Sequence, residues 1–198
     1  MKNTKLSTKT VIRFTALSLV ICMMFSLCSC KREVSEVSLE DFIKAMENVC
    51  GKGSSDASGS LSNDLGVIPS GILLDANDDT YDLSNFDKDL IVNGINFKRV
   101  VMKLDEDKVT YLSFSIRESE MNKKREDLPV KETYDTLYSA LCDLYGDPIE
   151  GYKEGWNYFV SSGVSGWKDG DYTVSAFWGD GYNEDMKNDQ FVITVKKN

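Results

Sequence analysis

The first thirty residues constrain this chain most, because they have the features of an export signal rather than of a folded domain. Four cations, at Lys2, Lys5, Lys9 and Arg13, precede an apolar run over residues 14–27, and no acid accompanies them. A positive segment followed by an apolar run is typical of a secretory signal peptide. A permanent membrane span needs about 20 apolar residues, so this run is too short for one. We therefore expect the folded domain to lie downstream.

The apolar run ends in Leu27-Cys28-Ser29-Cys30. This ending resembles the lipobox of bacterial lipoproteins, in which a Leu and two small residues precede an invariant Cys. The resemblance implies cleavage after residue 29, diacylation of the Cys30 thiol, and anchoring of the exported protein to the cell membrane or outer membrane. Lys31 stands where inner-membrane lipoproteins carry a retention Asp, and this implies the outer membrane in a host that has one.

The charge of the mature chain restricts its partners. Residues 1–29 hold four of the 23 cations and none of the 32 acids, so the remaining 169 residues carry 19 cations and a net charge of −13. Such an acidic domain is repelled by nucleic acids and by anionic lipid surfaces. We expect no nucleic-acid partner, and we expect the acyl chains to provide the membrane attachment.

The absence of histidine removes several kinds of chemistry. Neither a Ser-His or Cys-His nucleophile pair nor a His-ligated metal site can form. Asp75 to Asp79 opens like a calcium-binding EF-hand loop, but Thr80 and Phe86 occupy the positions that need Gly and a bidentate Glu. We therefore expect an acidic turn there, with no metal and no cofactor.

Two cysteines remain after cleavage and acylation, Cys50 and Cys142. A disulfide between them would close a loop of 92 residues and contribute about 4 kcal/mol. The alternative is a pair of free thiols that behave as small apolar side chains. The sequence leaves both alternatives open.

Hydrophobic periodicity predicts two helices and several strands. Apolar residues follow helical spacing from a Ser38 N-cap to Cys50 and again over 134–145. Residues 31–37 are expected to be a tether, 52–63 a mobile loop and 161–171 a connection. The predicted strands cover residues 72–74, 90–92, 100–104, 112–116, 156–160, 172–178 and 191–195, and the third and fourth form a hairpin.

This order predicts an α+β fold in which two helices pack on one face of an antiparallel sheet. The expected domains are a signal peptide at 1–29, a lipidated cysteine and tether at 30–37, and a single domain at 38–198. Two tandem α-β-β-β units, at 38–116 and 131–195, would build it. In its order of elements this arrangement is similar to the β-lactamase-inhibitor-protein fold and to small lipoproteins that assist outer-membrane barrel assembly.

Aromatic residues concentrate in the second half of the chain. Period-two counting places Trp156 and Trp178 on the helix-facing side of their strands. Trp167 falls in the expected connection, where it would be an exposed anchor for a partner. Phe159 and Phe177 have the opposite parity and are further candidates for partner binding.

These features favour a non-catalytic, lipid-anchored binding module for an unknown protein or glycan partner. One alternative is a carboxylate-dependent cell-envelope hydrolase, which predicts two carboxylates about 5 to 10 Å apart across a pocket. Another is an inhibitor or immunity-type lipoprotein with an exposed acidic and aromatic face. Ser165 and Lys168 spell the S-x-x-K of penicillin-recognising enzymes, but no S-D-N or K-T-G accompanies them, so we expect no catalytic role.

Overall fold

The computed structural model describes residues 32–75, 79–116, 130–153, 161–180 and 190–198, and their fold is α+β. Cys30, Trp156, Phe159 and the predicted strand at 156–160 lie outside these residues. The described helices are α2 (Leu39–Val49), α3 (Ser54–Leu65) and α4 (Val130–Tyr145).

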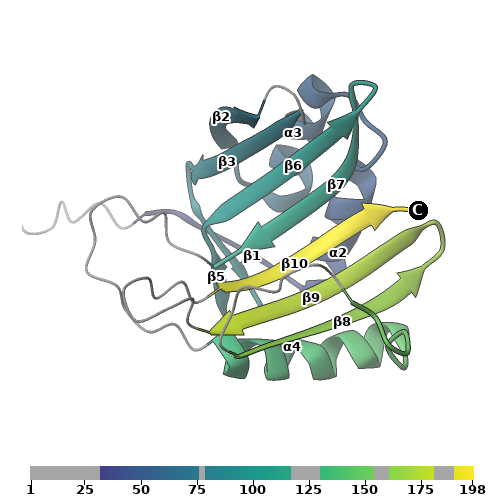
Figure 1. Cartoon of the computed structure of the whole chain (residues 1–198). Helices are drawn as coiled ribbons and strands as arrows, with labels where there is room; N and C mark the ends of the chain where they lie inside the picture. The colour runs from purple at the N-terminus through teal and green to yellow at the C-terminus, as the bar shows by residue number, and fades with distance from the viewer. Residues whose placement is uncertain (1–31, 76–78, 117–129, 154–160, 181–189) are drawn as a thin grey trace, which may run out of the picture. The chain divides into compact units, whose positions relative to one another are not determined.

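Seven strands form one antiparallel sheet in the order β2-β3-β6-β7-β10-β9-β8 (Figure 1). The last strands of the two predicted units, β7 and β10, pair with each other, so the halves of the chain meet at this join. The first half also carries a second helix and further short strands. The strand bounds are β2 Pro69–Asp75, β3 Thr80–Phe86, β6 Arg99–Asp105, β7 Lys108–Ser115, β8 Ser161–Asp169, β9 Tyr172–Asp180 and β10 Gln190–Lys197.

The predicted hairpin is confirmed as β6 and β7. Glu106 and Asp107 connect the strands, and both have positive φ, 49° and 61°. Positive φ at both central residues of a two-residue loop gives a twist that suits paired strands. The predicted strands at 72–74, 90–92, 172–178 and 191–195 are also confirmed, within β2, β4, β9 and β10.

The tether prediction is wrong for its second half. Residues Val34–Val37 form β1, which pairs in parallel with β4 (Asp89–Val92), and β4 pairs with β5 (Ile95–Phe97) in a separate small sheet. The Ser35 hydroxyl also donates to the Leu65 carbonyl at 2.5 Å. Backbone pairing thus orders a segment that is too polar to show a hydrophobic period.

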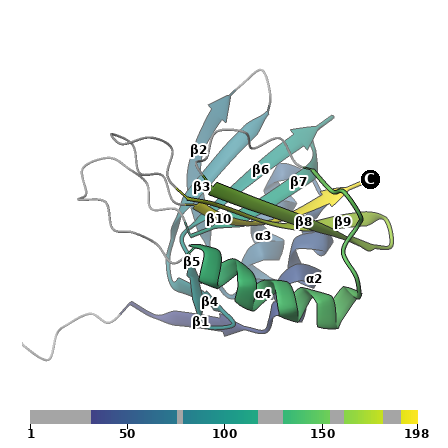
Figure 2. The ribbon, with the colours of Figure 1, turned by 60° about the horizontal axis from the view of Figure 1, so that its bottom comes forward.

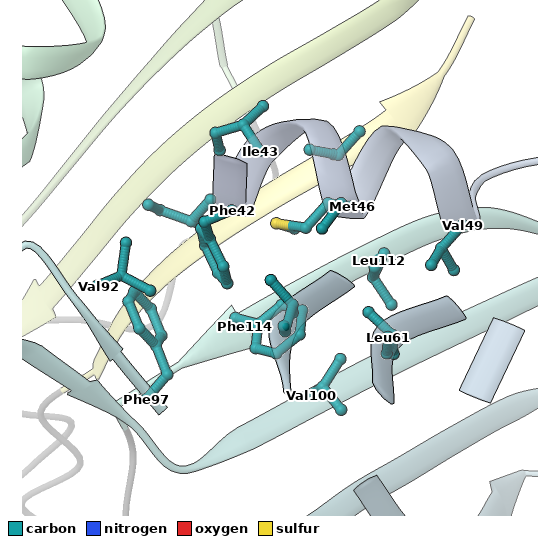
Figure 3. Close-up of a cluster of buried hydrophobic side chains, with 14 of the residues drawn as sticks. Phe42, Ile43, Met46, Val49, Leu61, Val92, Phe97, Val100, Leu112 and Phe114 are labelled. Atoms are coloured by element: carbon teal, nitrogen blue, oxygen red, sulfur yellow. The ribbon is translucent and has the colours of Figure 1, made fainter. Parts of the chain in front are cut away.

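The three helices lie on one face of the large sheet and cover the core (Figure 2). α2 begins at the predicted N-cap, where the Ser38 hydroxyl accepts from the Asp41 amide at 3.1 Å. Its apolar side packs around Phe42, whose ring centroid lies 5.2 Å from that of Phe97 on β5 and 4.9 Å from that of Phe114 on β7 (Figure 3). The predicted amphipathic stripe of α2 is therefore the central layer of the core.

The predicted loop at 52–63 is also wrong, because most of it belongs to α3. Ala57, Leu61 and Leu65 are buried at intervals of four residues. This spacing puts them on one side of a helix. The surrounding serines, glycines and aspartates have poor helix propensity, and packing against α2 and the sheet overrides it.

The expected connection at 161–171 contains a nine-residue strand, β8, followed by a turn. Its glycines give space to aromatic rings: a Cβ at Gly163 would lie 2.4 Å from Trp178 Nε1, and one at Gly166 would lie 2.7 Å from the Tyr152 ring. Glycine inside a strand can mark such a close approach rather than a loop. Trp178 packs against the core on the predicted side.

Candidate functional site

Trp167 is not the exposed anchor that the sequence predicts. Its side chain is 0% exposed, and its indole Nε1 donates to the Gly146 carbonyl at 3.2 Å. The ring of Tyr138 on α4 lies 5.7 Å away, centroid to centroid. β8 pairs Trp167 with Val174, whose side chain belongs to the core, so the indole points into the layer beneath α4.

Phe177 has the predicted parity but is also buried. It pairs with Val192 and Val164, on the side of the sheet opposite to the core residue Ala176, and only 3% of it is exposed. Phe177 therefore offers no exposed ring to a partner, which corrects the prediction. Phe159 lies outside the described residues.

Of the two alternatives for the cysteines, the structure has free thiols at Cys50 and Cys142. Cys50 is buried under α2, where its Sγ lies 3.9 Å from the Val195 carbonyl oxygen. Burial raises the pKa of the Cys50 thiol to about 12. A thiol with such a pKa is protonated and unreactive near neutral pH.

The most unusual chemistry among the described residues is a pair of acids, Glu47 and Asp169, which we call the carboxyl pair. Glu47 lies in the last turns of α2, at the edge of its buried stripe, and Asp169 ends β8. Burial raises the pKa of Glu47 from its ordinary value of 4.5 to about 7, and the charge of Asp169 and a hydrogen bond with it add to this effect.

An orphaned oxygen supports this protonation state. Glu47 Oε1 is buried and has no hydrogen-bond partner among the described residues. A carboxylate left in that position would be desolvated beside a second negative charge, whereas a protonated Glu47 can donate to Asp169. Near neutral pH Glu47 is therefore partly protonated, and its protonated form can donate to Asp169.

Tyrosines border the carboxyl pair. The pKa of Tyr145, the last residue of α4, is raised by burial, by the charges of Glu47 and Asp169, and by a hydrogen bond with Asp169. The pKa of Tyr172 is raised by burial and by nearby Cys50 and Glu47. The site thus joins α2, α4 and the β8–β9 turn, and its tyrosines stay neutral.

Sequence reasoning missed the carboxyl pair because its members are 122 positions apart in the chain. The one local signal was Glu47 itself, which lies four residues after buried Ile43 and next to buried Met46. An acid at that helical position is partly desolvated.

The geometry limits what the carboxyl pair can do. Glycosidases hold their two carboxyl groups about 5 Å or more apart so that a sugar or a water fits between them. Here the two groups are hydrogen-bonded to each other. Among the described ranges, no group of three or more Cys, Asp or Glu side chains is placed to hold a metal ion.

The carboxyl pair makes stability depend on pH. Because the pKa of Glu47 is higher in the folded state, its contribution is fully present below pH 4.5 and is lost as pH rises through 7. After allowance for solvent screening, we expect the free energy of unfolding to fall by about 1 kcal/mol between pH 5 and pH 8. Urea unfolding at the two pH values measures this.

Matched variants isolate the effect. We expect Glu47→Gln to remove this pH dependence, because an amide donates to Asp169 at every pH. Glu36→Gln, at an exposed position on β1, should keep it. An equal fall in Glu47→Gln and the wild type would contradict the assignment.

No described helix has both the length and the apolar character that a membrane crossing requires. Searches of protein-family models, curated proteins and solved structures find no match to this chain.

Proposed function

We propose that the protein is a lipid-anchored module of the bacterial cell envelope that binds a protein or glycan partner without catalysing a reaction. The proposal of a lipid anchor rests on the Leu27-Cys28-Ser29-Cys30 sequence at the end of an apolar run. The start of the described fold is consistent with this, because the first described strand begins at Val34, four residues after Cys30. A lipid anchor leaves all later residues free to form a water-exposed domain.

The chemistry of the chain supports binding rather than catalysis. It has no histidine, and its Cys50 thiol is buried with a raised pKa. Ser165 and Lys168, the S-x-x-K residues, lie on strand β8, where positions three apart point to opposite faces. The Ser165 hydroxyl instead accepts a hydrogen bond from the Tyr134 hydroxyl at 2.8 Å.

Cys30→Ala tests the anchoring. In a bacterial host, the wild-type chain should incorporate labelled palmitate and sediment with membranes, whereas Cys30→Ala should do neither. Cys28→Ala is the matched control, since it removes the neighbouring thiol and should keep both properties. Sedimentation of Cys30→Ala with membranes, or intact precursor in the cytosol, would contradict the proposal.

The carboxyl pair favours one second candidate, a carboxylate-dependent envelope hydrolase. Aspartic proteases also place two carboxyl groups against each other, and here Asp169 helps to raise the pKa of Glu47. This candidate predicts that the purified domain hydrolyses a protein or cell-wall substrate and that Glu47→Gln abolishes the activity. A reproducible activity with this dependence would replace the non-catalytic proposal.

A further inference from the structure

The distance between the lipidated cysteine and the first strand is short. Because β1 begins at Val34, only residues 31–33 separate it from Cys30. An extended residue spans at most about 3.6 Å, so the Cα atoms of residues 30 and 34 are no more than about 14 Å apart. The headgroup layer on each side of a bilayer is about 5 to 8 Å thick. If Cys30 is acylated, as proposed above, Val34 lies within or just above the headgroups.

Val34 lies near Ile68, and these two residues have the most exposed large apolar side chains among the described residues. Among the described residues, three such side chains are exposed: Val34 at 58%, Ile68 at 57% and Leu144 at 39%. The first two border the same segment, residues 87–89. Val34 pairs with Asp89, while the Asp87 amide donates to the Ile68 carbonyl at 3.4 Å and the Ile68 amide donates to an Asp87 carboxylate oxygen at 2.6 Å.

The lysines near Val34 and Ile68 are paired with acidic side chains. Lys88 Nζ lies 3.2 Å from the Glu33 carboxylate, and Lys98 Nζ lies 3.1 Å from that of Asp89. Both lysines are about one-third exposed, so their ammonium groups can also reach lipid phosphates. In a strongly acidic protein, this local balance suits a zwitterionic bilayer rather than an anionic one.

We propose that Val34, Ile68, Lys88 and Lys98 form a membrane-facing end that rests in the headgroup layer of a zwitterionic bilayer. The short link to Cys30 keeps this end close to the headgroups, and the two apolar side chains enter the layer. β1 and β4 lie along the lower edge of the described ribbon in Figure 2, with α2, α4 and the large sheet above them. The contact would therefore orient the large sheet relative to the membrane.

Fluorescence quenching tests the proposal on the acylated mature protein, which begins at Cys30. In a Cys142→Ser background, Val34→Cys, Ile68→Cys and Leu144→Cys are each labelled with a nitrobenzoxadiazole dye. Each is then reconstituted in phosphatidylcholine vesicles with a headgroup spin label. We expect at least about twofold quenching at positions 34 and 68 and little at 144, which is exposed but lies on α4.

A lengthened link provides the second arm. About 20 Gly and Ser residues inserted after Arg32 add a mean span of about 25 Å and should abolish the quenching at 34 and 68 while the protein still floats with vesicles. Equal quenching at all three positions in protein that floats, or quenching that survives the insertion, would overturn the proposal and leave the anchoring intact. Protein that does not float and carries no acyl chain would overturn both.

Discussion

We expect Trp167→Ala to lower the free energy of unfolding by about 3 to 5 kcal/mol, the usual cost of removing a fully buried tryptophan. The indole is the largest fully buried side chain among the described residues, and it fills the space between β8 and Tyr138 of α4. The substitution also removes the hydrogen bond that satisfies the Gly146 carbonyl. For a chain of this size the melting temperature should fall by about 6 to 20 °C in a thermal scan.

Two variants calibrate this result. Trp167→Phe keeps most of the apolar volume but loses the N–H donor, so we expect a loss of about 1 to 2 kcal/mol. Leu144→Ala removes a partly exposed side chain from α4 and should cost less than about 1 kcal/mol. A Trp167→Ala protein as stable as the wild type would show that the indole is a surface group after all.

We expect a loss of at least about 3 kcal/mol from Leu61→Asp, because it places an unpaired carboxylate in the core. Leu61 is 1% exposed on α3 and lies beneath α2 in the cluster around Phe114 and Val100 (Figure 3). Denaturant unfolding followed by circular dichroism measures the change. If residues 52–63 formed a loop, the same substitution would have almost no effect.

Asn63→Asp is the matched control for this experiment. It introduces the same charge two residues away, at an exposed position of the same helix. We expect its stability to stay within about 0.5 kcal/mol of the wild type. Equal stability of Leu61→Asp and Asn63→Asp would contradict the packing of α3 against the core.

The parts of the fold that are predictable from sequence are those whose hydrophobic period is undisturbed. α2 has an apolar stripe from Leu39 to Val49 and a serine cap, and β6 and β7 alternate apolar and polar residues around a short turn. In both cases the spacing of the buried apolar residues also indicates the secondary structure. The α+β fold class follows from these elements.

The parts that are not predictable depend on partners far along the chain. β8 looks like a loop because of Gly163 and Gly166, yet these glycines accommodate the rings of Trp178 and Tyr152. β1 is ordered by backbone pairing with β4, about 55 residues later. Tertiary contacts override local propensity at these positions.

The candidate site was also not predictable from the sequence. Glu47 and Asp169 are ordinary acids among the 32 of the chain, and only the fold brings the end of β8 close to α2. The raised pKa of Glu47 depends on its burial and on the nearby charge of Asp169, and neither can be read from one segment.

The pairing of β7 with β10 has a consequence for the order of events in the cell. Among the described strands β10 comes last in the chain, yet it lies between β7 and β9, and its inward side chains belong to the core. A nascent chain that lacks residues 190–197 would leave two strand edges open, so ribosome-bound intermediates cannot complete this sheet. The sheet therefore stays incomplete until this segment has been made.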